Sequence, residues 1–91
     1  MSNQDILDKG RLLVGQKVKL LVTPKDYVYR GVKYDMTSYV IDDPEMESKM
    51  RACAYNVRIK TPGTVWTQDY LMNRLNFKID KDGIITDVYL G

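Results

Sequence analysis

The sequence predicts a small α+β domain built from several short strands, one packed helix and a long exposed loop. Its 91 residues and 44% hydrophobic content suit a single globular domain with a modest core. Several short segments alternate apolar and polar side chains with the period of two that is typical of strands. Another segment carries a helix cap followed by apolar residues at helical spacing. These observations predict that residues 1–91 form one domain.

The N-terminal part of the chain, residues 1–42, is predicted to be mainly β structure. Residues 5–13 make a short amphipathic start, in which Gly10 argues against a long helix. The Thr-Pro-Lys-Asp segment 23–26 has the composition of a turn. Strands joined as two successive hairpins are expected on either side of it, at residues 14–22, 27–30 and 37–41.

A helix is predicted to begin after the Asp-Asp pair at 42–43. Aspartate is a favourable cap, and Pro44 suits the first helical position. Acidic side chains in the first turn and basic ones in the last complement the helix dipole. The apolar stripe that would cover a sheet consists of Met46, Met50, Cys53 and Ala54.

The last third of the chain predicts a strand, a long loop and a hairpin. Residues 55–60 alternate as a strand that ends at a Thr-Pro-Gly segment. The polar stretch that begins at Gly63 is too long for a hairpin turn and indicates a protruding loop. Strands at 74–80 and 84–89 then flank an Asp-Gly turn, a strong hairpin signal.

Two polar residues of the strand after the loop are candidates for holding the loop in place. Arg74 and Asn76 share one face of that strand because side chains alternate. A guanidinium with five donors and a side-chain amide could reach back to the Thr67 and Asp69 side chains and to main-chain carbonyls. The alternative is an ordered surface connection with a solvated Arg–Asp pair, worth under about 1 kcal/mol.

Several of these features together resemble the potato inhibitor I family and the related microbial elastase inhibitors, which inhibit serine proteases. They are Gly-Thr at 63–64, Thr-x-Asp-Tyr at 67–70, Arg-Leu-Asn at 74–76, the Asp-Gly turn and the glycine at 91. The resemblance covers about the last third of the chain. It implies a small mixed sheet, in which the strands that flank the loop are parallel and the helix packs across them. Residues 43–91 would form this inhibitor-like unit and residues 1–42 an additional N-terminal β extension.

The same resemblance implies a protease-binding loop and a serine protease as the protein partner. Gln68 falls at the position that enters the primary specificity pocket, and Arg74 and Asn76 at the positions that brace the loop. Burying an unpartnered amide costs about 1–3 kcal/mol, so a protease with a broad or polar pocket is expected, such as a subtilisin-like or glutamine-preferring enzyme. The loop residues are Thr64, Val65, Trp66, Thr67, Gln68, Asp69, Tyr70 and Leu71.

An alternative function is a non-inhibitory interaction module on the same scaffold, binding protein or nucleic acid through the N-terminal half. Its basic and aromatic side chains could neutralise phosphates and stack on bases, although such residues are also common in half-buried strands. An exposed edge strand there would also allow a homo-oligomer to form. The residues of this alternative surface are Lys17, Lys19, Tyr27, Tyr29, Arg30 and Lys33.

Composition argues against several other classes of protein. With no histidine, one cysteine and no glycine-rich phosphate loop, the chain is not expected to be an enzyme or to hold a cofactor. No metal site is expected, since the acidic turn near Asp80 lacks a closing glutamate. No apolar run is long enough to cross a membrane. The lone Cys53 and the lack of a secretion-signal pattern predict a cytoplasmic location.

Overall fold

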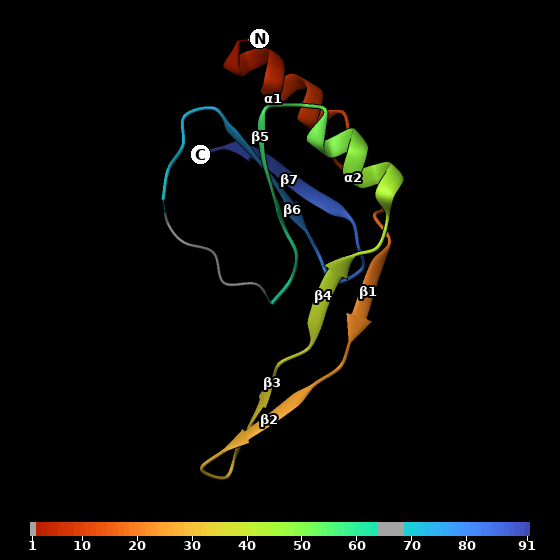
Figure 1. Ribbon diagram of the computed structural model, residues 1–91, viewed down its shortest axis with the longest axis vertical. Helices are drawn as coiled ribbons and strands as arrows, with labels where there is room; N and C mark the ends of the chain where they lie inside the picture. The colour runs from red at the N-terminus through yellow and green to blue at the C-terminus, as the bar shows by residue number, and fades with distance from the viewer. Residues whose placement is uncertain (1, 64–68) are drawn as a thin grey trace.

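The computed structural model describes residues 2–63 and 69–91, and these form an α+β protein with two helices and three small β-sheets (Figure 1). It is elongated, with principal extents of 51 × 27 × 17 Å. The elements in chain order are α1 (Asn3–Arg11), β1 (Leu20–Thr23), β2 (Asp26–Tyr29), β3 (Val32–Asp35), β4 (Ser38–Ile41), α2 (Pro44–Arg51), β5 (Asn56–Lys60), β6 (Arg74–Ile79) and β7 (Ile85–Leu90).

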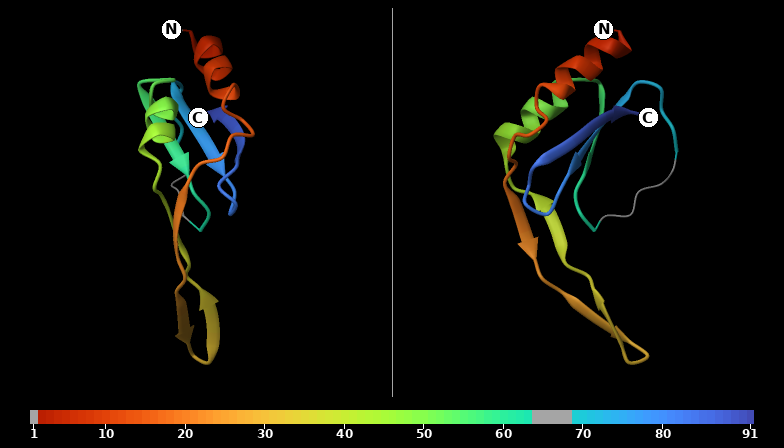
Figure 2. Two further views of the ribbon diagram at one scale, coloured as in Figure 1. Left: turned by 90° about the vertical axis from the view of Figure 1, so that its right-hand side faces the viewer. Right: turned by 180° about the vertical axis from the view of Figure 1, so that it is seen from behind.

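The body of the molecule, here called the head, consists of a three-stranded sheet and both helices. The strand order is β5-β6-β7, with β5 parallel to β6 and β6 antiparallel to β7. The helices lie on one side of this sheet, and residues 69–73, the described part of the β5–β6 connection that leads into β6, lie on the other side (Figures 1 and 2). The three strands agree with the predicted segments to within one residue at each end.

The prediction of a single helix is wrong, because residues 3–11 also form a helix. Ser2 caps α1, since its hydroxyl accepts from the Asp5 main-chain N–H and the Asp5 carboxylate accepts from the Ser2 N–H. Gly10, which lowers helix propensity, allows the helix to lie against β6 and β7. A Cβ added there would stand 2.6 Å from Val88 Cγ1 and 3.0 Å from Leu75 Cδ2. The N-terminal extension is therefore not all β structure.

Helix α2 begins where the sequence predicts it. The Asp43 carboxylate accepts a hydrogen bond from the Met46 N–H at 3.1 Å, and Pro44 occupies the first turn. Met46 and Met50 are buried on the side that faces the core. The core unites the two helices, the sheet and the segment before β1, and its largest fully buried apolar side chains are Phe77, Met50, Leu75, Ile85 and Val18.

A second correction concerns residues 20–41, which form one long two-stranded arm and not two successive hairpins. β1 pairs with β4 and β2 with β3, both antiparallel. The Met36 N–H donates to the Lys25 carbonyl at 2.7 Å where the two halves join. The arm projects from the head and ends in a two-residue turn (Figures 1 and 2). Arg30 and Gly31 form that turn with φ of 51° and 78°, as a type I′ hairpin turn requires.

Candidate functional site

A network of polar side chains lies on the face of the sheet opposite the helices. Successive residues of β6 point to opposite faces. Leu75 faces α1, as its closeness to Gly10 shows, so Arg74 and Asn76 lie on the other face, where the β5–β6 connection runs. Both are buried, with exposed fractions of 8% and 0%. The sequence predicted that Arg74 and Asn76 share a polar face of the strand, and in the structure both side chains on that face are buried.

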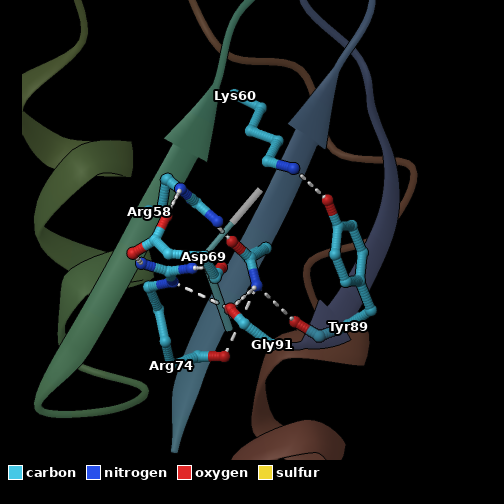
Figure 3. A network of polar contacts seen from close by, with 7 residues as sticks. Arg58, Lys60, Asp69, Arg74, Tyr89 and Gly91 are labelled. Atoms are coloured by element: carbon cyan, nitrogen blue, oxygen red, sulfur yellow. Dashed lines mark hydrogen bonds and ion pairs between the residues drawn. The ribbon is translucent and has the colours of Figure 1, made fainter. Parts of the chain in front are cut away.

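Arg74 joins the connection to the end of β7. Its Nη2 donates to the Asp69 main-chain carbonyl at 2.7 Å, and its Nη1 lies 3.2 Å from Asp69 Oδ2. Its Nε donates to the main-chain oxygen of Gly91 at 2.8 Å (Figure 3). Hydrogen bonds that involve a charged group are stronger than neutral ones. One guanidinium therefore fixes both the main chain and the side chain at residue 69.

Asn76 links β6 to the main chain at the end of β7 and to Arg58 on β5. Its Nδ2 donates to the main-chain oxygens of Gly91 at 3.1 Å and Tyr89 at 3.3 Å. Its Oδ1 accepts from Arg58 Nε at 3.0 Å, and Arg58 Nη1 lies 3.6 Å from Asp69 Oδ1. Two cationic side chains that are about one-tenth exposed therefore meet one carboxylate that is 54% exposed. The buried side is fully hydrogen-bonded, and Asp69 reaches from it toward solvent.

Two glycines mark the places where the connection meets the rest of the molecule. Gly63 has φ of 76°, and a Cβ there would stand 3.3 Å from the Thr37 carbonyl at the base of β4. Gly91 has φ of 149°, and a Cβ there would stand 3.3 Å from the Tyr70 ring. The positive φ favours glycine at both positions, and at Gly63 a Cβ would also crowd a main-chain oxygen. The connection is thus packed against the arm at its beginning and against the end of β7 after Asp69.

The predicted loop residues fall partly outside the part of the chain that the structure describes. Thr64, Val65, Trp66, Thr67 and Gln68 lie outside the described residues. Of the other three, Asp69 belongs to the network, Tyr70 is 69% exposed and Leu71 is 44% exposed. The predicted contact of Arg74 or Asn76 with Thr67 lies outside the described residues as well.

Sequence reasoning missed Arg58 and the two main-chain acceptors near the end of β7. The parallel pairing places Arg58 directly beside Asn76, and the antiparallel pairing places Tyr89 on the other side of Asn76. Alternation in the segment 55–60 already put Arg58 on one face with its neighbours two residues away. Only the register between strands, which the sequence does not display, shows that this is the face of Asn76.

The six residues of the alternative surface are not brought together. Lys17 pairs with Ile84 in an isolated bridge on the head, and the Lys19 N–H donates to Asp43 at the base of the arm. The others lie at the far end of the arm. There Tyr27 and Tyr29 stack with ring centroids 6.3 Å apart, Arg30 lies 5.2 Å from the Tyr29 centroid, and Lys33 forms an ion pair with Asp26 at 3.3 Å.

Cys53 and the acidic residues form no reactive cluster in residues 2–63 and 69–91. Burial raises the pKa of the Cys53 thiol, which donates to the Lys49 carbonyl at 3.4 Å. The described residues contain no group of three histidine, cysteine, aspartate or glutamate side chains suited to a metal ion. No helix among them is long and apolar enough to cross a membrane.

The network is suited to holding a main-chain segment in a fixed position beside solvent. It combines buried donors, the half-exposed Asp69 carboxylate and main-chain acceptors at Asp69 in the connection and at Gly91 after β7. No family model, curated protein or solved structure matches this chain. The polar network and the sequence motifs are therefore the features that bear on its function.

Proposed function

We propose that the chain is a serine protease inhibitor with a potato inhibitor I-like head. Residues 64–71 would bind in the protease active site as a substrate does, with Gln68 in the primary specificity pocket and Gln68–Asp69 as the bond presented for attack. Arg74 and Asn76, with Arg58, would hold the loop from beneath. In this proposal the chain is a binding protein and not an enzyme.

The observation that carries the proposal is the pair of bonds from Arg74 to the main chain and side chain of Asp69. Asp69 directly follows the bond that the motif match assigns as the presented one. A buried guanidinium at 2.7 Å from its carbonyl fixes the loop within one residue of that bond. After cleavage, the same contacts would keep the new N-terminus, Asp69, in place beside the bond, which favours religation over release.

Energetics explain why such an anchor matters to an inhibitor. Fixing one residue's main chain costs about 1–2 kcal/mol, so ordering six contact residues on binding would cost roughly 6–12 kcal/mol. Nanomolar affinity corresponds to only about 12 kcal/mol. A loop that is ordered before binding avoids most of this cost. The buried network supplies that order at the described end of the loop.

The arrangement of the head supports the same proposal. α2 is followed by β5, the long connection and β6, and the two strands that flank the connection are parallel, as the resemblance implies. The sheet adds an antiparallel β7 after the Asp-Gly turn. The free Cys53 thiol fits a reducing compartment, so the proposed location is the cytoplasm.

A protease panel tests the proposal directly. Wild type, Gln68→Leu, Arg74→Ala and the control Lys78→Ala would be assayed against subtilisin-like, chymotrypsin-like and glutamine-preferring enzymes. Lys78 is an exposed residue of the same strand. We expect Gln68→Leu to change which enzyme is inhibited, and Arg74→Ala to turn the protein into a substrate cut after residue 68. Lys78→Ala should inhibit as wild type does.

The competing function is a non-inhibitory interaction module. If no enzyme in the panel is inhibited by any folded variant, the inhibitor proposal fails. Mass spectrometry of the products separates the remaining outcomes, since cleavage elsewhere than after residue 68 would mean that the motif match assigns the wrong bond. The observation that favours a module is the exposed apolar surface of the arm. The proposed inhibitor uses the head and gives this surface no role.

A further inference from the structure

The arm carries most of the large hydrophobic side chains that the described residues leave exposed. Among the described residues, nine of the fifteen exposed large hydrophobic side chains belong to it, each 44–64% exposed. A two-stranded hairpin alone is only marginally stable in water, and large exposed apolar patches mark interaction sites. The nine are Leu21, Val22, Tyr27, Val28, Tyr29, Val32, Tyr34, Met36 and Val40.

Three of these side chains are tyrosines, each about half exposed. A buried aromatic side chain covers about 150–250 Å², so each tyrosine leaves roughly 70–130 Å² of its surface in water. Within the described chain β2 pairs only with β3, so its outer edge is also open to a further strand.

The main-chain groups of Val28 point toward that outer edge. In a hairpin with a two-residue turn, the pair that flanks the turn exchanges hydrogen bonds, and so does every second pair after it. Here those pairs are Tyr29 with Val32 and Tyr27 with Tyr34, and the Met36–Lys25 hydrogen bond continues the series. The N–H and C=O of Val28 therefore face away from β3.

The sequence of β2 and the tip is complementary to itself when two copies run antiparallel about Val28. In that register, Val28 lies opposite Val28 of the second copy, Tyr27 opposite Tyr29, and Asp26 opposite Arg30. Apolar residues then pair with apolar ones and aromatic with aromatic on matching faces, and Arg30, which follows β2 in the turn, comes close to Asp26 of the second copy. The contact is isologous, since each pair occurs twice about a two-fold axis.

We propose that two copies of this chain associate through their β2 edges, antiparallel about Val28, and join their arms into a four-stranded sheet. The aromatic faces of the two arms, each made of Tyr27, Tyr29, Val32 and Tyr34, then become continuous. A second copy fits the arm better than a nucleic acid does. Residues 24–37 carry three basic and two acidic side chains, and Lys33 is already paired with Asp26.

Sedimentation equilibrium of the whole protein over a range of concentrations tests this dimer. Wild type should reach twice its chain mass of 10.6 kDa. Asp26→Arg and Arg30→Asp each place like charges opposite one another and should weaken self-association by about tenfold or more. An equimolar mixture of the two variants restores both opposite-charge pairs, so we expect a heterodimer. Far-ultraviolet circular dichroism would confirm that each variant is folded.

Two further variants test the position of the axis. Val28→Lys puts two ammonium groups at the two-fold axis and should abolish the dimer. Val40→Lys is the matched control, because Val40 is also more than half exposed on the arm but lies on β4. Wild type that stays monomeric at millimolar concentration, or a mixture that stays monomeric, overturns the proposal. So does a wild-type monomer that binds a short oligothymidylate with steep salt dependence. The test involves no protease, so its result is separate from the proposed inhibition.

Discussion

The head buries its large hydrophobic side chains, whereas the arm leaves most of its own exposed. In the head Phe77 and Leu75 have no exposed surface, and every buried side-chain nitrogen or oxygen of the described residues has a hydrogen-bond partner. In the arm Tyr27 and Val28 are 52% and 64% exposed, and the strands are held by ladder hydrogen bonds, a stacking contact and the exposed Lys33–Asp26 ion pair. The difference indicates that the stability of the monomer resides in the head. The open edge of the arm is the place where the proposed dimer would form.

The largest expected effect comes from the centre of the head. Phe77→Ala removes a fully buried aromatic ring and should lower the free energy of unfolding by about 3–5 kcal/mol. Val28→Ala on the arm should change it by less than about 0.5 kcal/mol in the monomer. Urea denaturation at low protein concentration compares the two. Similar losses in both variants would mean that the arm is part of one cooperative core.

The next effect concerns the polar network beneath the connection. Arg74→Ala removes the Arg74 hydrogen bond to the Asp69 carbonyl and one of the two hydrogen bonds to the Gly91 oxygen, and both involve a charged donor, so we expect a loss of about 2–4 kcal/mol. The Asp69 ion pair adds little of this, because that carboxylate is half exposed. Arg74→Lys should recover only part of the loss, since one ammonium cannot reproduce the three directed bonds.

Denaturation of Arg74→Ala, Arg74→Lys and the control Lys78→Ala would measure this effect. Lys78 is exposed on the same strand, so its removal should be nearly neutral. Limited proteolysis adds a local readout, because release of Asp69 should speed cleavage between β5 and β6. If Arg74→Ala and Lys78→Ala are equally stable and equally resistant to cleavage, the network does not hold the connection.

A smaller effect is expected at the contact between α1 and the sheet. Helix propensity alone predicts that Gly10→Ala stabilises the protein by about 1 kcal/mol. The added Cβ would stand 2.6 Å from Val88 Cγ1, and a β-branched side chain in a buried strand has little freedom to turn away. We therefore expect a net loss of about 1–2 kcal/mol. Gly10→Ala combined with Val88→Ala should cost less than the sum of the single changes, whereas simple additivity would contradict the clash.

The head could be predicted largely from local signals in the sequence. The Asp-Pro start placed α2, and alternation placed β5, β6 and β7 to within one residue. Arg74 and Asn76 were placed on one face for the same reason. The burial of that face and the part played by Arg58 depend on strand register and on the path of the connection, which are tertiary properties.

The arm and α1 show where local reasoning fails. The turn signal at residues 23–26 suggested a hairpin, but those residues lie near the junction of two strand pairs, and the reversal occurs at Arg30–Gly31. Pairing of β1 with β4 is a contact between segments far apart in the sequence, which no local pattern encodes. Gly10 lowered the expectation of a helix, although its lack of a side chain is what lets α1 pack.

The smallest expected effect lies at the junction of head and arm and depends on pH. Hydrogen bonds from the Met46 N–H and then the Lys19 N–H hold the pKa of the Asp43 carboxyl below its usual range. Because the pKa is lower in the folded state, Asp43 stabilises the protein fully above its unfolded value of about 3.9. That contribution is lost as the pH falls through the folded pKa.

Asp43→Asn isolates this effect, because asparagine caps a helix about as well but does not titrate. Denaturation at about pH 5 and about pH 3 should show a larger acid-induced loss in wild type than in the variant. Carbon NMR of the Asp43 carboxyl should give a titration midpoint below that of a free aspartate. An equal acid response in both proteins would mean that the Lys19 and Met46 contacts do not favour the charged form. The base of the arm would then be held to the start of α2 by the Asp42–Lys19 main-chain hydrogen bond and the β1–β4 pairing, and acid would leave this joint intact.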